Sequence, residues 1–344
     1  MTTTNKQIAI VILNWNGSAL MQKFLPSVIR YSQEELADVI VADNGSTDDS
    51  LQMLNNKFPS VKIIRLDKNY GFAEGYNQAL KQINHPYTVL LNSDVEVAPN
   101  WLDAPFKMLE ENPDIVAVQP KIKAEHHRNL FEYAGASGGF MDIYGYPFCR
   151  GRLLHIVEED IDQYNEPIDI LWATGACLFI RTNIYKEAGG LDSGFFAHQE
   201  EIDLCWRLRS RGYRLVCTPQ SVIYHVGGGT LNAESPRKTF LNFRNNLLML
   251  YKNLPEEDLH RVMNLRRILD YIAATKFFLC GHPKNAWAVY KARREFHALI
   301  PSYQEKRKEN LSKTTLHNIP ELKSYSLLWQ FYIRGRKHYS DLPQ

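Results

Sequence analysis

The predicted fold is built around one apolar segment and the acidic turn that follows it, Tyr87-Thr-Val-Leu-Leu-Asn-Ser-Asp-Val-Glu-Val97. Residues 88–91 are apolar without helical spacing, which is typical of a central strand covered on both faces. Asn92 and Asp94 follow two residues apart, so on an extended backbone their side chains point to the same side. Ligands of open α/β sheets bind beyond the carboxyl ends of the strands, which favours a binding site here. Asn, Ser and Asp also form turns, so the segment alone is equally compatible with a plain turn.

Three further apolar segments precede this one, and each ends in a polar loop. They span residues 8–13, 39–42 and 61–66, and amphipathic stretches lie between them. Strands that alternate with helices of about a dozen residues indicate βαβ units and a parallel sheet. We therefore predict an α/β fold with a Rossmann-like, mostly parallel sheet and helices on both faces.

The second part of the chain has a different pattern. From Pro236 onward the apolar spacing is helical, and the Gly-rich segment 226–235 separates this region from the alternating strands and helices. A chain of 344 residues has room for one large domain and a smaller appendage. We predict a catalytic domain over residues 1–235 and a C-terminal helical region over residues 236–344.

Composition narrows the class of protein. The apolar content of 44% and the charged content of 23% are those of a globular protein. No apolar run approaches the roughly 18 residues of a membrane helix, and residues 8–13 are too few for a secretory signal. Five cysteines without a C-x-x-C pattern fit reduced thiols better than disulfides or a zinc site. We expect a cytoplasmic protein.

Charge is distributed unevenly along the chain. Residues 251–344 carry 17 Lys and Arg against 9 Asp and Glu, a formal charge of +8, whereas residues 1–250 carry −6. A basic tail on a mildly acidic body suggests an anionic partner, either lipid head groups or nucleic acid, although a solvated helical face explains it nearly as well. Aromatic residues that could anchor such a tail at a membrane are Trp287, Phe296, Trp329 and Phe331.

Four polar loops follow the predicted strands, at residues 14–17, 43–50, 69–71 and 92–94. In a doubly wound sheet these strand ends gather along one edge, so we expect a cleft lined by carboxylates and amides. The sequence has no Gly-x-x-x-x-Gly-Lys phosphate loop, so a bound diphosphate would need a metal to neutralise it. Asp94 and a neutral His225 are ligands that suit Mg²⁺ or Mn²⁺.

Taken in order, seven motifs resemble the family 2 glycosyltransferases of GT-A fold, and most closely their rhamnosyltransferase-like branch, which builds bacterial surface polysaccharides. The resemblance covers residues 8–250. The motifs are Ile-Leu-Asn-Trp-Asn-Gly17, Val-Ala-Asp-Asn-Gly-Ser-Thr-Asp48, Asn-Tyr-Gly-Phe-Ala-x-Gly-Tyr-Asn77, Leu-Leu-Asn-Ser-Asp-Val-Glu96, Thr-Gly-Ala176, Glu-Glu-Ile-Asp-Leu-Cys-Trp-Arg207 and His225.

The resemblance implies a nucleotide site. Asp43 would accept a hydrogen bond from the imide N–H of uracil or thymine, and Asp94 and His225 would hold the metal. Asn92 stands where the family's Asp-x-Asp motif has its first acid, which contacts ribose; a neutral amide attracts a cation less. The other residues implied at the nucleotide are Asn14, Gly71, Asn77 and Arg244. Asp43 could instead cap a turn, and Asn14 and Asn77 could cap helices.

The resemblance also implies a catalytic base and an acceptor site. Glu201 matches the second member of the family's Glu-Asp pair, which takes the proton of the acceptor hydroxyl. Glu200 borders the acceptor in this scheme and is the nearest rival for the role of base. Trp172, Gly175 and Ala176 would also border the acceptor, with a buried strand as the alternative for that segment. We interpret Asp203 and Arg207 as a structural i, i+4 pair.

These expectations define an enzyme, an inverting, metal-assisted glycosyltransferase. It would move one sugar from a UDP- or dTDP-sugar, such as dTDP-rhamnose, to a lipid-linked saccharide acceptor, with Mg²⁺ or Mn²⁺ as cofactor. We expect an anionic membrane surface as partner, with attachment to the inner membrane face and no nucleic acid; the oligomeric state stays open. The alternatives are an inactive nucleotide- or saccharide-binding module and a sugar nucleotidyltransferase, which should carry a basic Gly-rich loop where residues 14–17 have none.

Overall fold

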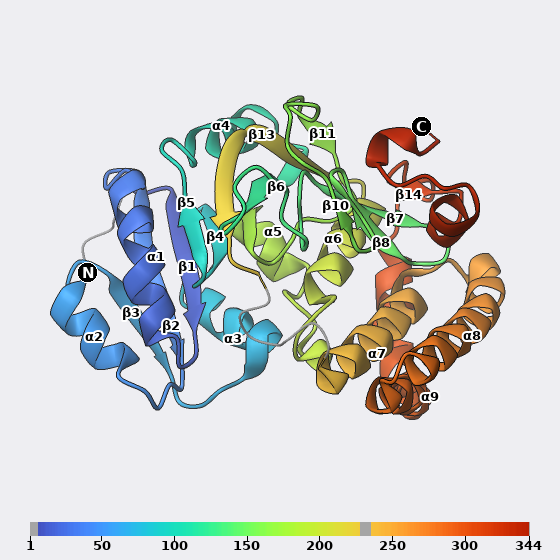
Figure 1. Ribbon diagram of the computed structural model, residues 1–344. Coiled ribbons are helices and arrows are strands. Elements are labelled where there is room, and N and C mark those ends of the chain that lie inside the picture. The colour runs from blue at the N-terminus through green and yellow to red at the C-terminus, as the bar shows by residue number, and fades with distance from the viewer. Residues whose placement is uncertain (1–5, 228–234, 344) are drawn as a thin grey trace.

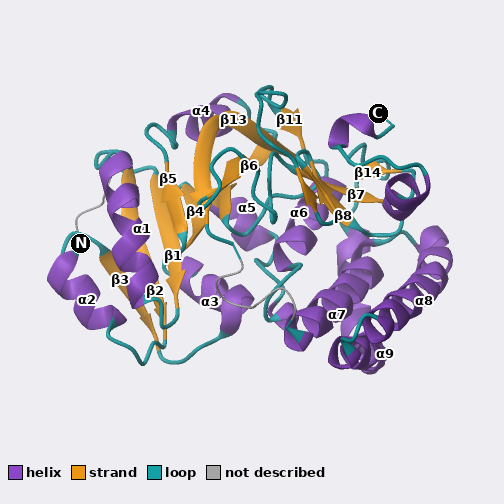
Figure 2. Cartoon of the chain, viewed as in Figure 1, coloured by secondary structure: helices purple, strands orange, loops and turns teal. Residues whose placement is uncertain are grey.

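A nine-stranded sheet forms the body of the molecule, as the computed structural model of residues 6–227 and 235–343 shows (Figures 1 and 2). Its strands are β1 (Ile8–Asn14), β2 (Ala37–Asn44), β3 (Lys62–Leu66), β4 (Tyr87–Asn92), β5 (Val95–Val97), β6 (Ile115–Ala124), β11 (Ile168–Asp169), β12 (Cys177–Arg181) and β13 (Arg214–His225). Their order is β11-β13-β6-β12-β4-β1-β2-β3, and β5 pairs with β13.

Most of the paired residues in this sheet lie in parallel ladders, which confirms the predicted fold class, whereas β5, β11 and β12 pair antiparallel with their neighbours. β1 pairs in parallel with β2 and β4, β2 with β3, and β6 with β13. β12 runs antiparallel between β4 and β6. β13 is one long strand with register shifts between Arg214 and Leu215 and between Thr218 and Val222.

Helices cover both faces of the sheet. On one face lie α1 (Ser18–Tyr31), α2 (Ser50–Lys57) and α4 (Asp103–Glu111); on the other lie α3 (Gly71–Leu80), α5 (Thr182–Glu187), the short 3₁₀ helix η1 (Ser193–Phe195) and α6 (Glu200–Ser210). Successive residues of β1 enter different cores, with Ile8, Ile10 and Ile12 in one and Ala9 and Val11 in the other. A strand alternates its side chains between two faces, so a continuous apolar run marks a strand buried on both.

A second sheet has five strands, four from residues 139–157 and one from the C-terminal region. Its order is β10-β9-β8-β7-β14. The strands are β7 (Gly139–Asp142), β8 (Pro147–Cys149), β9 (Arg152–Leu153), β10 (Ile156–Val157) and β14 (Leu322–Lys323). β14 comes from the C-terminal region and pairs in parallel with β7, at Leu322 opposite Met141.

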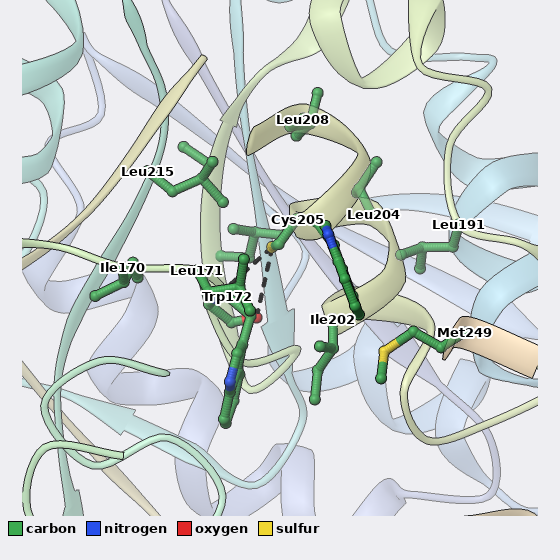
Figure 3. Packing of buried hydrophobic residues seen from close by; sticks show 14 of the residues in the cluster. Ile170, Leu171, Trp172, Leu191, Ile202, Leu204, Cys205, Leu208, Leu215 and Met249 are labelled. Atoms are coloured by element: carbon green, nitrogen blue, oxygen red, sulfur yellow. Dashed lines mark hydrogen bonds between the residues drawn. The ribbon is translucent and has the colours of Figure 1, made fainter. Parts of the chain in front are cut away.

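The C-terminal region consists mainly of three helices, α7 (Pro236–Asn253), α8 (Glu256–Leu279) and α9 (Pro283–Ser312), followed by β14, the π-helical turn η2 (Trp329–Ile333) and the 3₁₀ turn η3 (Tyr339–Asp341). α7 packs against both α6 and α9. Residues of both predicted domains share one core, and Figure 3 shows Met249 of α7 beside Ile202 of α6. The division near residues 226–235 stays a prediction, and residues 228–234 lie outside the described part.

Within the described ranges, no helix combines the length and the apolar character that crossing a bilayer requires. Phe296 and Phe331, which the sequence suggested as membrane anchors, expose only 2% and 1% of their surface. The prediction that these two residues anchor the chain at a membrane was wrong, because each ring packs in the main core. Trp287 and Trp329 are exposed.

Candidate active site

The ends of β1 and β2 bring Asn14 and Asp43 together. The two residues are direct neighbours in the parallel register, and Asn14 Nδ2 donates to Asp43 Oδ1 over 3.2 Å. Asp43 Oδ2 accepts from the backbone N–H of Ser46. Each Asp43 oxygen keeps a lone pair beyond these bonds, and the buried Asn14 Oδ1 has no partner among the described residues. A Cβ at Gly17 would lie 2.5 Å from that oxygen, so the close turn needs glycine there.

Gly71 lies at the start of α3, where the loops after β2 and β3 meet. Asn44 Nδ2 donates to the Gly71 carbonyl over 3.0 Å and to Asn69 Oδ1 over 3.1 Å. Gly71 has a φ of +77°, and a Cβ there would lie 2.8 Å from the ring of Phe196. Both facts require glycine at this position. The sequence had indicated Gly71, but it gave no role to Asn44 or Phe196.

The acidic turn after β4 contacts the end of β13. Asp94 Oδ1 lies 3.2 Å from His225 Nε2, and Asn92 Nδ2 lies 3.4 Å from the same nitrogen. On the other side of the ring, His225 Nδ1 lies 3.4 Å from Glu132 Oε1. Burial alone would lower the pKa of His225, but the two carboxylates outweigh it and raise that pKa to about 10. Sequence reasoning brought Asn92, Asp94 and His225 to one place and missed Glu132.

This cluster can be tested as a site for Mg²⁺ or Mn²⁺. Among the described residues, no three His, Cys, Asp or Glu side chains are grouped to enclose a metal. These cations bind in many enzymes through one or two side chains, with water and substrate phosphates completing the shell, so Asp94 and His225 are a sufficient protein contribution. Glu132 behind the imidazole matches the carboxylate that commonly orients a metal-binding histidine. The residues present therefore fit the cation, which would displace the proton that the raised pKa keeps on His225, so the neutral His225 expected from the sequence applies only to the metal-bound site.

The first turn of α6 carries two carboxyl groups, one on the buried Glu200 and one on the half-buried Glu201. Burial, followed by the charge of Glu201, raises the pKa of Glu200 well above its ordinary value. Burial also raises the pKa of Glu201, to about 6, against the opposing effect of nearby backbone N–H groups that include that of Gly175. Oε2 of each residue has no partner among the described residues. Glu200 therefore resists ionisation, while Glu201, with a pKa of about 6, is largely ionised at neutral pH.

Segment 174–176 contacts both the acidic turn after β4 and the first turn of α6. The Ala176 carbonyl accepts from the backbone N–H of Asn92 over 3.0 Å, and the Gly175 N–H points toward Glu201. A Cβ on Gly175 would lie 3.0 Å from the ring of Phe72, which follows Gly71. Segment 174–176 thus contacts the turn after β4 at Asn92, the start of α3 at Phe72 and the carboxyl group of Glu201.

Trp172 lies away from any surface that an acceptor could contact. The indole exposes 2% of its area and donates from Nε1 to the Phe140 carbonyl over 2.9 Å. A Cβ on Gly139 would lie 2.2 Å from the ring. In this conformation Trp172 belongs to the core (Figure 3), as the buried-strand alternative had it.

Asn77 and Arg244 are held by other parts of the chain. The Asn77 side chain bonds to the Leu191 carbonyl over 2.8 Å and to the Tyr185 hydroxyl over 2.7 Å. It lines a cavity of about 660 Å³ that contains none of the strand-end residues. Arg244 Nη1 pairs with Glu295 over 2.7 Å, and Nη2 donates to the Phe195 carbonyl. Nucleotide contacts for Asn77 and Arg244 stay predictions.

The Asp203–Arg207 pair has the structural role that its spacing indicated. Arg207 Nε donates to Asp203 Oδ2 over 2.9 Å, which confirms the i, i+4 contact. Lys252 and Asn253 of α7 also bond to Asp203, each over 2.9 Å. The first turn of α6, which also carries Glu200 and Glu201, is thus fastened to α7.

A comparison with known protein families decides the assignment. The model of the family described as Glycosyl transferase family 2 matches residues 9–188, more than half of the chain. The chain belongs to this family. It is a glycosyltransferase of GT-A fold, as the motifs had indicated.

Curated relatives of this family 2 glycosyltransferase are distant in sequence. The N-acetylglucosaminyl-diphospho-decaprenol L-rhamnosyltransferase of Mycobacterium tuberculosis is 23% identical over 235 residues, which cover 63% of this chain and 75% of the relative. The low-salt glycan biosynthesis hexosyltransferase Agl10 of Haloferax volcanii is 22% identical, with coverage of 70% and 74%.

Solved structures support the fold of this family 2 glycosyltransferase. GalNAc-T7 with UDP, GalNAc and Mn²⁺ superposes with a TM-score of 0.62 at 16% identity, over 96% of this chain and 57% of that one. TarS 1-349 of S. aureus with UDP gives a TM-score of 0.52 at 17% identity, over 89% and 88%. At such identities the likeness concerns the fold alone.

Proposed function

We propose that this glycosyltransferase moves a single sugar from a UDP- or dTDP-sugar, such as dTDP-rhamnose, to a lipid-linked saccharide acceptor in the synthesis of a surface polysaccharide. The reaction is a single displacement that inverts the anomeric carbon. Similarity to the mycobacterial rhamnosyltransferase, whose name specifies a diphospho-decaprenol acceptor, supports the acceptor class. A lipid-linked acceptor would confine the reaction to a membrane surface, and we propose that this surface is the inner face of the membrane.

One observation carries the proposal: a buried carboxylate with a pKa of about 6 and a free oxygen stands at the start of α6. A general base works best when its pKa lies close to the working pH, because it is then ionised and still binds a proton strongly. Glu201 meets this condition, whereas burial of Glu200 disfavours its ionised form. We assign to Glu201 the removal of the acceptor's hydroxyl proton as that oxygen attacks the sugar.

The donor is proposed to bind along the ends of β1, β2 and β4. Asp43 has free lone pairs for the imide N–H of uracil or thymine, and Asn14 offers its unpartnered Oδ1 beside it. A divalent cation on Asp94 and His225 would neutralise the charge of the departing diphosphate. Glu132 would keep the His225 ring oriented with Nε2 toward that cation.

The experiment is a screen of sugar nucleotides for release of nucleoside diphosphate, first with water and then with lipid-linked saccharides as acceptor. We expect release from a UDP- or dTDP-sugar and none from GDP- or ADP-sugars. Glu201→Gln keeps the size of the side chain but removes its basicity, so transfer should fall roughly 10²- to 10⁴-fold while donor affinity is retained.

Glu200→Gln is the matched control, because it changes the adjacent carboxyl group on the same helical turn. If this variant loses transfer and Glu201→Gln does not, the base is Glu200. A chain that binds UDP or dTDP but releases no diphosphate from any donor would instead be a binding module. Release of pyrophosphate from a nucleoside triphosphate and a sugar phosphate would indicate a nucleotidyltransferase.

A further inference from the structure

The hairpin of α8 and α9 exposes an unusual number of large apolar side chains. Seven of the fourteen that are exposed in the described residues lie between Arg267 and Arg294, although this stretch is a small part of the chain. They are Ile268, Tyr271, Ile272, Phe278, Leu279, Trp287 and Tyr290. Phe278 and Leu279 adjoin the turn between the helices and expose 65% and 78% of their surface. Soluble proteins rarely gather so much apolar surface without a partner for it.

Part of this apolar surface is a continuous hollow along one side of α8. Ile268, Tyr271, Ile272 and Leu279 line it together with Lys276, and its volume is about 690 Å³. Their spacing places them on one helical face. Lys276 Nζ lies 5.9 Å from the ring centre of Tyr332, so the exposed side chains of η2 border the same face.

The exposed charges on both sides of the turn of this hairpin, between residues 267 and 294, all have one sign. Between residues 267 and 294, all of which are described, five cations are exposed: Arg267, Lys276, Lys284, Lys291 and Arg294. None of them has a carboxylate partner among the described residues. The one acid of the stretch, Asp270, is fully buried between the helices, where it pairs with Arg293 over 2.6 Å and with Arg266 over 3.2 Å.

We propose that the exposed face of the α8–α9 hairpin, with the adjoining turn η2, docks on an anionic lipid bilayer. Exposed cations attract the head groups, while aromatic and aliphatic side chains enter the boundary of the acyl chains. A second copy of the chain fits this face poorly, because five unpaired cations on each copy would repel. Nucleic acid offers the charge but no apolar phase for Phe278 and Leu279.

The docking proposal adds a location to the proposed function. It rests on that function for the choice of membrane, which is the one that carries the acceptor. α7 packs against α9 on one side and against the catalytic helix α6 on the other, so the hairpin is joined to the site through one helix (Figure 1). Docking would hold the enzyme on the surface across which its acceptor diffuses.

Flotation of the full chain with vesicles tests this proposal. We expect co-flotation with vesicles that contain 30% phosphatidylglycerol, weak binding to pure phosphatidylcholine, and release as the salt rises from 50 mM to 500 mM. The variant with Phe278→Ser and Leu279→Ser, and the variant with Lys276→Glu, Lys284→Glu and Lys291→Glu, should each lose binding by roughly 100-fold. Because these side chains are exposed, the variants should keep the melting temperature of the parent.

Matched controls replace exposed residues of the same types elsewhere. Lys107 of α4 and Ile161 are both about 72% exposed, and Lys107→Glu and Ile161→Ser should leave flotation unchanged. The proposal is overturned if the parent does not bind anionic vesicles at low salt, or if the hairpin variants bind as well as the controls. It is also overturned if the hairpin variants turn a dimer into a monomer or abolish binding of RNA without changing flotation. Nucleoside diphosphate release in solution should be equal in all variants, so failure of docking is separated from failure of the proposed function.

Discussion

The two adjacent carboxyl groups of α6 differ in how far burial raises their pKa values. Burial, followed by its neighbour's charge, raises the pKa of Glu200 well above the ordinary range, so this carboxyl group resists ionisation. Glu201 has a pKa of about 6 because nearby backbone N–H groups offset part of the cost of burying its charge. One turn of helix therefore holds a proton donor or hydrogen-bond partner beside a base.

A pH profile should show this difference. The base is active when ionised, so kcat/KM for transfer should fall on the acid side with an apparent pKa of about 6. Glu200→Gln should keep this acid limb, and Glu201→Gln should remove it and leave a low rate that is flat in pH. An acid limb that persists in Glu201→Gln would assign the base to another group.

Glu132 is expected to act through His225 rather than on the substrate. Glu132→Gln weakens the contact at Nδ1, so it should lower the affinity for Mn²⁺ by roughly 10- to 100-fold. Mn²⁺ binding in the presence of UDP, followed by electron paramagnetic resonance, measures this without turnover. Glu125→Gln is the control, because the Glu125 carboxylate pairs with Lys23 while only its backbone bonds to His225. Equal affinities in both variants would leave Glu132 with a structural role.

At the scale of elements, the position of α6 depends on buried ion pairs that join it to α7. Asp203 pairs with Arg207 of the same helix and with Lys252 of α7, and we call this group the ionic junction. Burial would raise the pKa of Asp203, but Lys252 and Arg207 outweigh it and lower that pKa. Asp192 is also bonded to Lys252, so the loop before α6 joins the same junction. The neighbouring segment has three non-glycine residues with positive φ, at Phe196, His198 and Gln199. Strained backbone next to a catalytic residue persists only where its surroundings fix it firmly.

Asp203→Asn should destabilise the fold, by about 3–5 kcal/mol at pH 7, because it leaves two buried cations without their full partner. A carboxylate with a lowered folded pKa stabilises above its unfolded pKa, and this contribution is lost as the pH falls through the folded value. The gap between parent and variant in urea unfolding should therefore be largest at neutral pH and shrink below about pH 4. Asp114→Asn, at an exposed pair with Arg214, is the control that should change little. A gap that is constant from pH 7 to pH 3 would contradict the ionic account.

Much of this architecture can be predicted from the sequence, because strand β1 and its neighbours carry their signal locally. A strand buried on both faces is a continuous apolar run, and parallel strands direct their carboxyl ends to one edge, so Asn14, Asp43 and Asp94 were expected near one another. The small sheet carried no such signal. Its strands are two to four residues long, and β14 pairs with β7 although about 180 residues separate them along the chain.

The site residues that sequence reasoning missed share a physical reason. Glu132 does not lie at the end of a predicted strand and belongs to no periodic pattern. Only the folded structure shows that its carboxylate lies next to Nδ1 of His225. Asn44 directly follows Asp43, yet its role is to hold the loop at Gly71, which no local pattern encodes. Trp172 was placed at the acceptor from its motif, whereas burial against Gly139 is a property of the tertiary structure.

For the whole molecule, the shared core predicts one cooperative unit. Leu248 of α7 is fully buried in the core that also contains Ile202 and Leu171. Leu248→Ala should cost about 2–5 kcal/mol and lower a single thermal transition, seen equally by circular dichroism and by loss of UDP stabilisation. Ile272→Ala, at an exposed site on α8, is the matched control. Two separated transitions would instead support independent domains.

The pairing of β14 with β7 also bears on biosynthesis. β7 leaves the ribosome long before residues 322–323, so during most of synthesis the outer edge of the small sheet has backbone N–H and C=O groups without their strand partner. Unpaired edges are the sites at which nascent chains associate wrongly. The partner arrives only after α7, α8 and α9 have been made, and pairing over such a separation is slow. Yield of the folded enzyme should therefore depend on the rate of translation and on chaperones that shield that edge until the last strand is in place.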